Sequence, residues 1–183
     1  MLGAFRPKPT QLHGDLVKTL LLMRHAKSDW DADYERDHDR PLNERGVRSA
    51  RIMGRLLARQ QLIPDLVITS SAQRAHATAR IGSEAGAWGI DPVVEPALYT
   101  AGPGDVLDVA GHAQEVSRLM LVGHQPTWSM VVRTLTGESL EMKTATIAVV
   151  ELAIDDWDDV GPRTGTLAAV LQPREHLNTD LDH

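Results

Sequence analysis

The chain contains no cysteine among its 183 residues. This absence excludes disulfide bonds, catalysis by a thiolate and a zinc site with cysteine ligands. The chain also lacks an apolar run long enough to cross a membrane, because Lys18 and Thr19 interrupt the longest run. Its first residues lack the apolar stretch and the cleavage site of a signal peptide. We therefore expect a cytoplasmic protein that has no membrane partner.

The chain has no excess of positive charge either. Its 19 Lys and Arg residues are outnumbered by 25 Asp and Glu residues, so the formal net charge is −6. Nucleic-acid binding that does not depend on sequence needs a cationic surface, so we expect no nucleic-acid partner. The length is ordinary for one domain with a substantial core. We expect a single domain over residues 16–175, between a loose arm (1–15) and a loose tail (176–183).

Short apolar runs alternate along the chain with segments that have helical character. The runs at 16–23, 66–69 and 119–122 read as buried strands, and residues 92–98 contain a further short strand. Helices are expected over residues 43–60, 72–84, 105–115 and 127–136, with Asn43 as the N-cap of the first. Strand–helix alternation predicts an α/β fold with a mostly parallel sheet covered by helices on both faces. Residues 144–154 and 166–171 are expected to close the sheet as antiparallel strands.

Arginine, histidine and serine residues follow three of the predicted strands. Arg24 and His25 follow the first strand, Ser70, Ser71 and Arg74 follow the second, and His124 follows the strand at 119–122. The carboxyl ends of parallel strands meet at one edge of a sheet, so we expect these side chains to converge. Two arginines and two histidines would repel one another without an anion, and arginine binds phosphate oxygens in a bidentate manner. The pattern therefore predicts a phosphoryl-binding site, to which the helix that follows Ser71 adds N–H groups.

Histidine can act as the nucleophile at such a site. The role requires one free ring nitrogen, while the other is held by a hydrogen bond, often to a backbone carbonyl. We assign this role to His25. Arg24 and Arg74 would hold the phosphate oxygens, and a cationic His124 would stabilise charge in the transition state. No metal or cofactor is expected, because the arginines neutralise the phosphate. Lys27 and Ser28 are predicted as further substrate-binding residues. The six other histidines are interpreted as structural or solvated.

The loop over residues 29–39 is rich in aspartate, and two interpretations stay open. It can be a solvated acidic loop, or a rim over the site that contacts substrate. A calcium loop is the weaker interpretation, because the glycine and the terminal glutamate of such loops are missing.

Four stretches carry a resemblance to a known family. They are Leu-Met-Arg-His-Ala-Lys-Ser (22–28), Arg-Pro-Leu-Asn-Glu-Arg-Gly (40–46), residues 69–79 around Arg74, and Leu-Val-Gly-His-Gln-Pro (121–126). In this order they resemble the histidine phosphatase superfamily, and within it the small SixA-like phosphohistidine phosphatases. Ala26 stands where many members of the superfamily have glycine, a substitution that SixA-like members share.

The resemblance implies a three-layer α/β/α fold like that of the phosphoglycerate mutases. It also implies His25 as the phosphorylated nucleophile, and Arg24, Arg74 and His124 as phosphate-pocket residues. An acid that protonates the leaving group is not identified, and Glu95 and Asp105 are candidates by rough position only. A phosphohistidine leaving group is a basic imidazole, so it would need less help from such an acid.

Three functions are compatible with these residues. The first is a phosphatase that acts through phospho-His25, with protein-borne phosphohistidine as the expected substrate. The second is a small-molecule phosphatase or mutase, acting for example on a sugar phosphate or a nucleotide. The third is a non-catalytic module that recognises phosphate. The short chain lacks the insertions that cover the pocket of larger relatives, which favours a protein substrate. The oligomeric state is left open.

Overall fold

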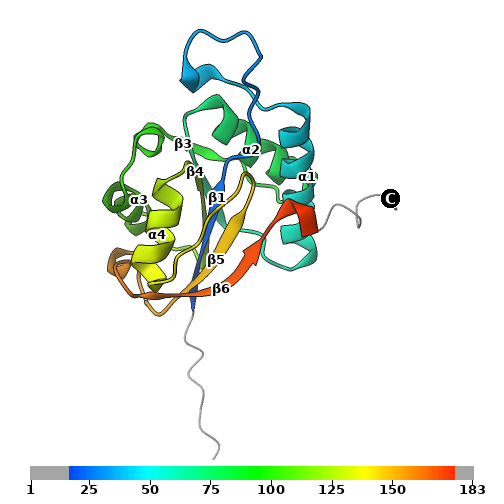
Figure 1. The fold of residues 1–183 in the computed structure, drawn as a ribbon. Helices are drawn as coiled ribbons and strands as arrows, with labels where there is room; N and C mark the ends of the chain where they lie inside the picture. Colours follow the sequence, from blue (N-terminus) through cyan, green and yellow to red (C-terminus); the bar gives the residue numbers. More distant parts are fainter. Residues whose placement is uncertain (1–16, 176–183) are drawn as a thin grey trace, which may run out of the picture.

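A computed structural model describes residues 17–175 (Figure 1). The loose arm and the loose tail predicted at 1–15 and 176–183 lie outside this range. The helices are α1 (Glu44–Arg59), α2 (Gln73–Ala85), α3 (Pro103–Gly111) and α4 (Thr127–Thr136). The strands are β1 (Lys18–Arg24), β2 (Leu66–Ser70), β3 (Val93–Glu95), β4 (Arg118–Gly123), β5 (Ile147–Leu152) and β6 (Gly165–Leu171). Short 3₁₀ helices are η1 (Asp37–Asp39), η2 (Pro96–Tyr99), η3 (Trp157–Asp159) and η4 (Pro173–Glu175). Among residues 17–175, no helix has both the length and the apolar character that a membrane crossing requires.

The strands form one six-stranded sheet in the order β3-β2-β4-β1-β5-β6. Strand β1 pairs in parallel with β4, and β2 pairs in parallel with both β4 and β3. Strands β5 and β6 run antiparallel and form the other edge. This arrangement confirms the predicted α/β fold with a mostly parallel central sheet and an antiparallel edge.

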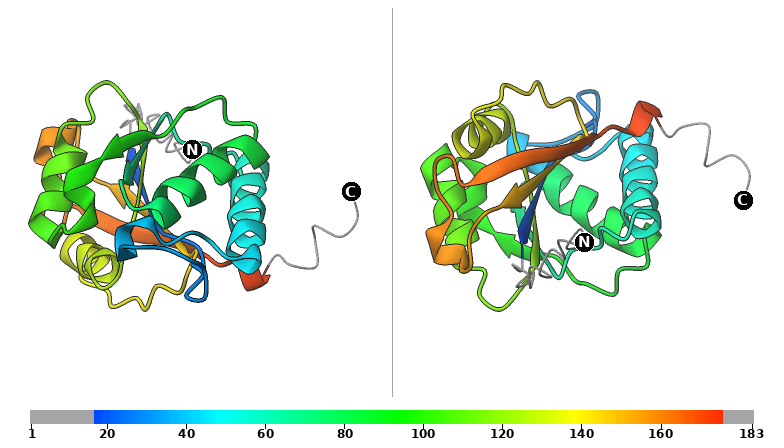
Figure 2. Two further views of the ribbon diagram at one scale, coloured as in Figure 1. Left: turned by 90° about the horizontal axis from the view of Figure 1, so that it is seen from above. Right: turned by 90° about the horizontal axis from the view of Figure 1, so that it is seen from below.

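Helices cover the sheet on both faces, so the molecule has three layers. Helices α1 and α2 lie on one side of the sheet and α3 and α4 lie on the other (Figure 2). Alternate residues of β1 face opposite layers: Leu21 and Met23 pack in the cluster with α1 and α2, whereas Leu20 and Leu22 pack in the cluster with α3 and α4. A strand buried on both faces needs a continuous apolar run, which explains why residues 20–23 are uniformly apolar.

Several elements begin or end where local chemistry demands it. The side chain of Asn43 accepts a hydrogen bond from the Gly46 N–H, which confirms Asn43 as the N-cap of α1. Strand β3 ends at Glu95, before Pro96, which lacks an N–H group and begins η2. Helix α3 ends earlier than predicted, before Glu115 adopts a left-handed conformation with φ of 62°.

The ends of β1 and β4 lie side by side, and the residues after them are held firmly. Arg24 is in register with Gly123, and the His25 N–H donates to the Gly123 carbonyl at 2.9 Å. On the other side, the Ala145 N–H donates to the carbonyls of Arg24 (3.1 Å) and His25 (3.2 Å). Ala145 has φ of 60°, and this turn is why β5 starts later than the sequence pattern indicated. The loop between β1 and α1 rises above this edge of the sheet (Figure 1).

Candidate active site

A cavity of about 230 Å³ opens at the carboxyl edge of β1 and β4. The six residues predicted from the sequence as catalytic or substrate-binding all line it, from three separate parts of the chain: Arg24, His25, Lys27, Ser28, Arg74 and His124. Trp30, Arg40, Gln125 and Thr144 complete the lining. Parallel strands that end at one edge bring these distant segments together.

His25 has the hydrogen-bond arrangement that a nucleophilic imidazole needs. The side chain is only 8% exposed, and Nδ1 lies 2.8 Å from the carbonyl oxygen of Ala26. A carbonyl can only accept, so Nδ1 carries the proton and Nε2 has its lone pair free. The Ala26 N–H in turn donates to the hydroxyl of Thr78 on α2 at 3.0 Å, which fixes the backbone after His25.

Burial keeps His25 neutral. The pKa of His25 is lowered to about 3, mainly by loss of solvent. The hydrogen bond to Ala26 opposes this shift, whereas the nearby His124, Arg74 and Arg24 add to it. The imidazole is therefore uncharged at neutral pH, so Nε2 is available to attack an electrophile.

His124 lies beside His25, with 5.2 Å between the ring centroids. Its Nε2 is 2.8 Å from the hydroxyl of Ser70, and its Nδ1 is buried without a hydrogen-bond partner. Burial, followed by the charge of Arg74, lowers the pKa of His124 to about 4. Without a bound anion the His124 ring is therefore neutral, because the lack of solvent and the surrounding positive charges favour this form. The cationic form expected in the transition state stays a prediction.

Two arginines present unsatisfied donors at the cavity. Arg24 Nη1 donates to the Met142 carbonyl at 2.8 Å. Arg74 makes two hydrogen bonds to Asp37: Nη1 donates to its backbone carbonyl (2.7 Å) and Nη2 donates to its carboxylate (3.0 Å). The Nε atoms of both arginines are buried without a hydrogen-bond partner. Buried donors usually have partners. An oxyanion in the cavity would supply acceptors for these donors.

The loop over residues 29–39 lies at the rim of the cavity, where Trp30 lines it and Asp37 contacts Arg74, whereas Asp31, Asp33 and Glu35 are exposed to solvent. Both interpretations therefore hold for parts of the loop, and contact with substrate stays a prediction. The Asp37 carboxylate bridges Arg74 and Arg40, and it also accepts from the Tyr99 hydroxyl at 3.2 Å. Burial alone would raise the pKa of Asp37, but the charges and hydrogen bonds of Arg74 and Arg40 outweigh it and lower the pKa. Among residues 17–175, no group of three or more His, Asp or Glu side chains is arranged to hold a metal ion.

Sequence reasoning missed several residues of this rim. Arg40 is 5% exposed, donates to the Ser28 hydroxyl and lies 3.5 Å from the ring centroid of Trp30. His38, interpreted as structural or solvated, contacts the Ser71 hydroxyl through Nε2 and the edge of Tyr99. The position of Arg40 in the motif at 40–46 was a signal for it. One interpretation of the aspartate-rich loop made it a rim but did not single out Asp37, and no pattern in the sequence pointed to Tyr99.

Two further expectations are corrected. Glu95 accepts a hydrogen bond from the Ala97 N–H and Asp105 accepts one from the Gly102 N–H, so both carboxylates cap short helices, and neither lines the cavity. Ala72 is the N-cap of α2. The Ser70 hydroxyl contacts His124, and the Ser71 hydroxyl contacts His38 on the rim.

Comparison with known proteins agrees with this geometry. The sequence profile of the histidine phosphatase superfamily (branch 1) matches residues 20–106. An uncharacterized protein of Mycobacterium tuberculosis is 36% identical over 165 residues, which cover 83% of this chain and 100% of that protein. A 2,3-bisphosphoglycerate-dependent phosphoglycerate mutase of Nocardia farcinica is 38% identical over 72 residues, which cover 38% of this chain and 29% of the mutase.

Solved structures of SixA proteins superpose on most of the chain. SixA from Agrobacterium tumefaciens is 32% identical, with a TM-score of 0.73 over 85% of this chain and 98% of its own. A protein histidine phosphatase SixA complexed with tungstate shares the fold, with a TM-score of 0.69 at 24% identity over 86% of this chain and 98% of its own. The chain belongs to the histidine phosphatase superfamily of phosphatases and mutases, in its SixA-like branch.

Proposed function

We propose that this protein is a phosphatase that hydrolyses protein-borne phosphohistidine through a covalent intermediate on His25. The observation that carries the proposal is the state of His25. Its Nδ1 is held by the Ala26 carbonyl, its Nε2 is free, and its ring lies in the same cavity as Arg24, Arg74 and His124. These four residues are proposed as the catalytic residues.

In the first step, the lone pair of His25 Nε2 forms a bond to phosphorus. The bond from phosphorus to the leaving nitrogen of the substrate breaks, and that imidazole keeps the electron pair and takes a proton from solvent. Arg24 and Arg74 hold the phosphoryl oxygens in line, and their unpaired Nε–H groups donate to them. The approach of a phosphate raises the pKa of the neighbouring His124. The protonated ring then donates a hydrogen bond to a phosphoryl oxygen.

In the second step, a water oxygen attacks phosphorus and the bond to Nε2 breaks. Both protons of the water leave with the phosphate as dihydrogen phosphate. His25 regains its free Nε2, because the Nδ1 proton stays in its hydrogen bond to the Ala26 carbonyl throughout. Asp37 is ionised and engaged with Arg74, so it is a poor proton donor. An imidazole leaving group tolerates this, because it is basic enough to be protonated near neutral pH.

The exposed rim of the cavity favours a phosphoryl group carried by a protein. Trp30, on the loop above it, is 63% exposed and offers an apolar contact to a partner. The fold itself does not select the substrate, since a mycobacterial glucosyl-3-phosphoglycerate phosphatase shares it at 15% identity with a TM-score of 0.61 over 84% of this chain and 100% of its own.

Trapping of the intermediate tests the proposal. The protein is mixed with a labelled phosphohistidine peptide and quenched in alkali, in which phosphohistidine survives. We expect one label on the wild-type chain, located at His25, and none on His25→Asn, whose amide can replace Nδ1–H as a donor to Ala26. Turnover by His25→Asn at the wild-type rate would overturn the mechanism. A panel with sugar phosphates and nucleotides tests the substrate class, and higher kcat/KM for those than for the peptide would overturn it.

A further inference from the structure

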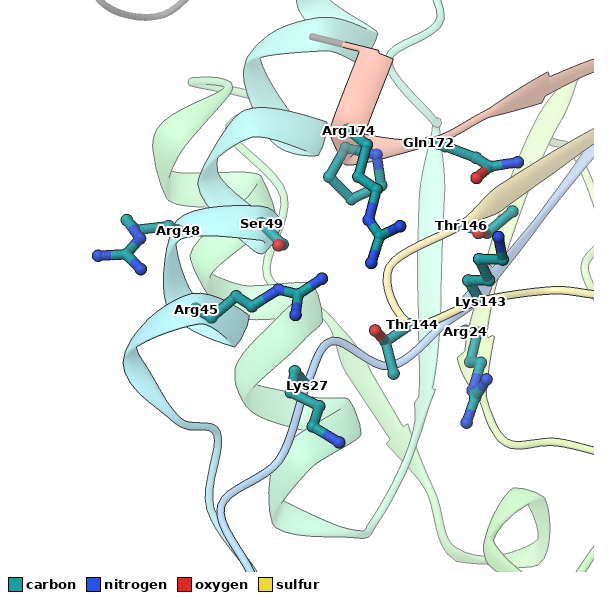
Figure 3. A pocket seen from close by; sticks show the side chains of 11 residues that line it. Arg24, Lys27, Arg45, Arg48, Ser49, Lys143, Thr144, Thr146, Gln172 and Arg174 are labelled. Atoms are coloured by element: carbon teal, nitrogen blue, oxygen red, sulfur yellow. The ribbon is translucent and has the colours of Figure 1, made fainter. Parts of the chain in front are cut away.

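A second, larger cavity of about 500 Å³ adjoins the catalytic cavity (Figure 3). The two share Arg24, Lys27 and Thr144 in their linings, so these three residues lie between the two cavities. The second cavity lies between α1, the segment before β5 and the residues that follow β6. Nothing in the proposed reaction uses it.

All charged residues that line this cavity are cationic. Six of its eleven residues are Lys or Arg, and none is Asp or Glu: Arg24, Lys27, Arg45, Arg48, Lys143 and Arg174. The whole chain has 19 Lys and Arg against 25 Asp and Glu, so this lining departs strongly from the composition. Glu141, whose charge acts on Arg24, lines a different hollow.

Two of the six cationic side chains face a common space (Figure 3). The guanidinium groups of Arg45 and Arg174 point toward each other across the cavity, whereas Arg48 points away (Figure 3). Within residues 17–175, no acidic side chain forms an ion pair with Arg45, Lys143 or Arg174. Like charges that face one cavity without a counter-charge repel one another. An oxyanion placed between them would remove this repulsion.

Thr146 provides an independent observation. It lines the same cavity, is 0% exposed, and its Oγ1 has no hydrogen-bond partner. A buried hydroxyl without a partner costs free energy, and it is rare in native proteins. A ligand oxygen in the cavity would supply the missing partner.

We propose that this cavity is a second anion subsite, which binds an oxyanion carried by the same substrate close to the scissile phosphoryl group. The shared chemistry is a carboxylate or a phosphate. Its source is an acidic side chain that flanks the phosphohistidine of a target protein, or a second phosphate on a small substrate. The assignment of the substrate rests on the proposed function, whereas the binding of an oxyanion by the cavity does not.

Titration with inorganic phosphate, followed by amide NMR, tests the subsite without any turnover. We expect shifts at Ser49, Thr146 and Gln172 that saturate separately from those near His25 and Arg74. In Arg45→Ala/Arg174→Ala the affinity at the second cavity falls at least tenfold. The control Arg51→Ala/Arg55→Ala removes the same charge from exposed positions of α1 that do not line the cavity, and it leaves both sites unchanged. Lys143→Ala provides a second variant from another wall of the cavity. Shifts confined to the His25 cavity, or unchanged affinity in Arg45→Ala/Arg174→Ala, would overturn the proposal.

Kinetics identify the source of the oxyanion. One arm compares phosphohistidine peptides flanked by Asp with peptides flanked by Asn, and the other compares a sugar bisphosphate with its monophosphate. For the wild type, we expect a KM at least tenfold lower for the more anionic member of one pair. In Arg45→Ala/Arg174→Ala this difference in KM should disappear, while kcat stays the same. No preference in either arm would overturn the assignment to the substrate. Absence of turnover with every substrate, together with intact phosphate binding at both cavities, would contradict the proposed function and leave the anion subsite supported.

Discussion

At the scale of single residues, the site is marked by buried polar atoms that have no hydrogen-bond partner among residues 17–175. The Nε atoms of Arg24 and Arg74, Nδ1 of His124 and Oγ1 of Thr146 make up four of the five unsatisfied buried side-chain atoms in residues 17–175. All four residues line one of the two adjoining cavities. Unsatisfied donors cost stability, so their concentration at one edge of the sheet indicates a place built for an anion.

Removing Arg74 should therefore weaken catalysis strongly. We expect Arg74→Ala to lower kcat/KM roughly 100-fold, about 3 kcal/mol of transition-state stabilisation, because a preorganised donor is lost. Arg74→Lys keeps the charge but loses the fork, so an intermediate loss is expected. Steady-state kinetics with a phosphohistidine peptide measure the effect. Arg80→Ala, on the exposed face of the same helix, is the control. A kcat/KM within threefold of wild type for Arg74→Ala would contradict this role.

Acidification should destabilise the fold through His25. Its pKa of about 3 is below the ordinary value of 6.5, so between these values the unfolded chain binds a proton that the folded chain excludes. The stability contribution of the neutral ring is full above pH 6.5 and is lost as pH falls toward 3. Between pH 7 and 4.5 the loss is on the order of 2 kcal/mol.

Urea unfolding of the wild type and of His25→Asn across this range measures that loss. We expect the wild type to lose more stability on acidification than the variant, which has no imidazole at this position. Parallel pH profiles for the two proteins would show that His25 takes up its proton equally in both states.

At the scale of elements, close packing of α1 on α2 supports the site. A Cβ added at Gly54 would lie 2.1 Å from the backbone oxygen of Gly82, so the two helices meet backbone to backbone. Helix α2 also carries Arg74 and Thr78, and Thr78 holds the backbone after His25. The glycine contact therefore sets where two residues of the site lie.

Gly54→Ala should reduce stability, because overpacking forces the helices apart. We expect a loss of about 1–3 kcal/mol, which corresponds to a Tm lower by roughly 5 °C. Differential scanning calorimetry measures it. Gly104→Ala in α3, where an added Cβ meets no atom within 4 Å, is the control and should leave Tm unchanged or slightly raised. Equal Tm values for wild type and Gly54→Ala would mean that the helices adjust without cost.

At the scale of the whole molecule, charge is unevenly distributed. The chain carries a net charge of −6, yet the two cavities at one edge of the sheet are lined by Lys and Arg without a single Asp or Glu. A cationic concavity on an anionic protein attracts an anionic substrate to one place and repels it elsewhere.

Salt should therefore weaken the capture of substrate. At 0.1 M ionic strength the Debye length is about 10 Å, so added salt screens the attraction. We expect kcat/KM for a phosphorylated substrate to fall several-fold between about 20 mM and about 500 mM NaCl, because the Debye length shortens several-fold over this range. Stopped-flow or steady-state rates provide the measurement. The slope should be shallower in Arg45→Ala/Arg174→Ala than in Arg51→Ala/Arg55→Ala, and identical slopes would contradict steering by this edge.

Much of the fold follows from local patterns. The continuous apolar run at 20–23 predicts a strand buried on both faces, and Asn43 predicts the start of α1; both features are present. A strand carries the residues at its end to the edge of the sheet, so Arg24, His25 and His124 were predictable as neighbours.

The sequence alone determined the order of strands and helices and the side chains that the strand ends deliver, because periodicity and strand ends are local properties. Tertiary structure decided the path of the loop over the cavity, which sets Asp37 between Arg74 and Arg40. It also brought Arg45, Lys143 and Arg174 around one space, although about 130 positions separate the first from the last. Such contacts depend on how distant segments pack, and no local pattern of residues encodes them.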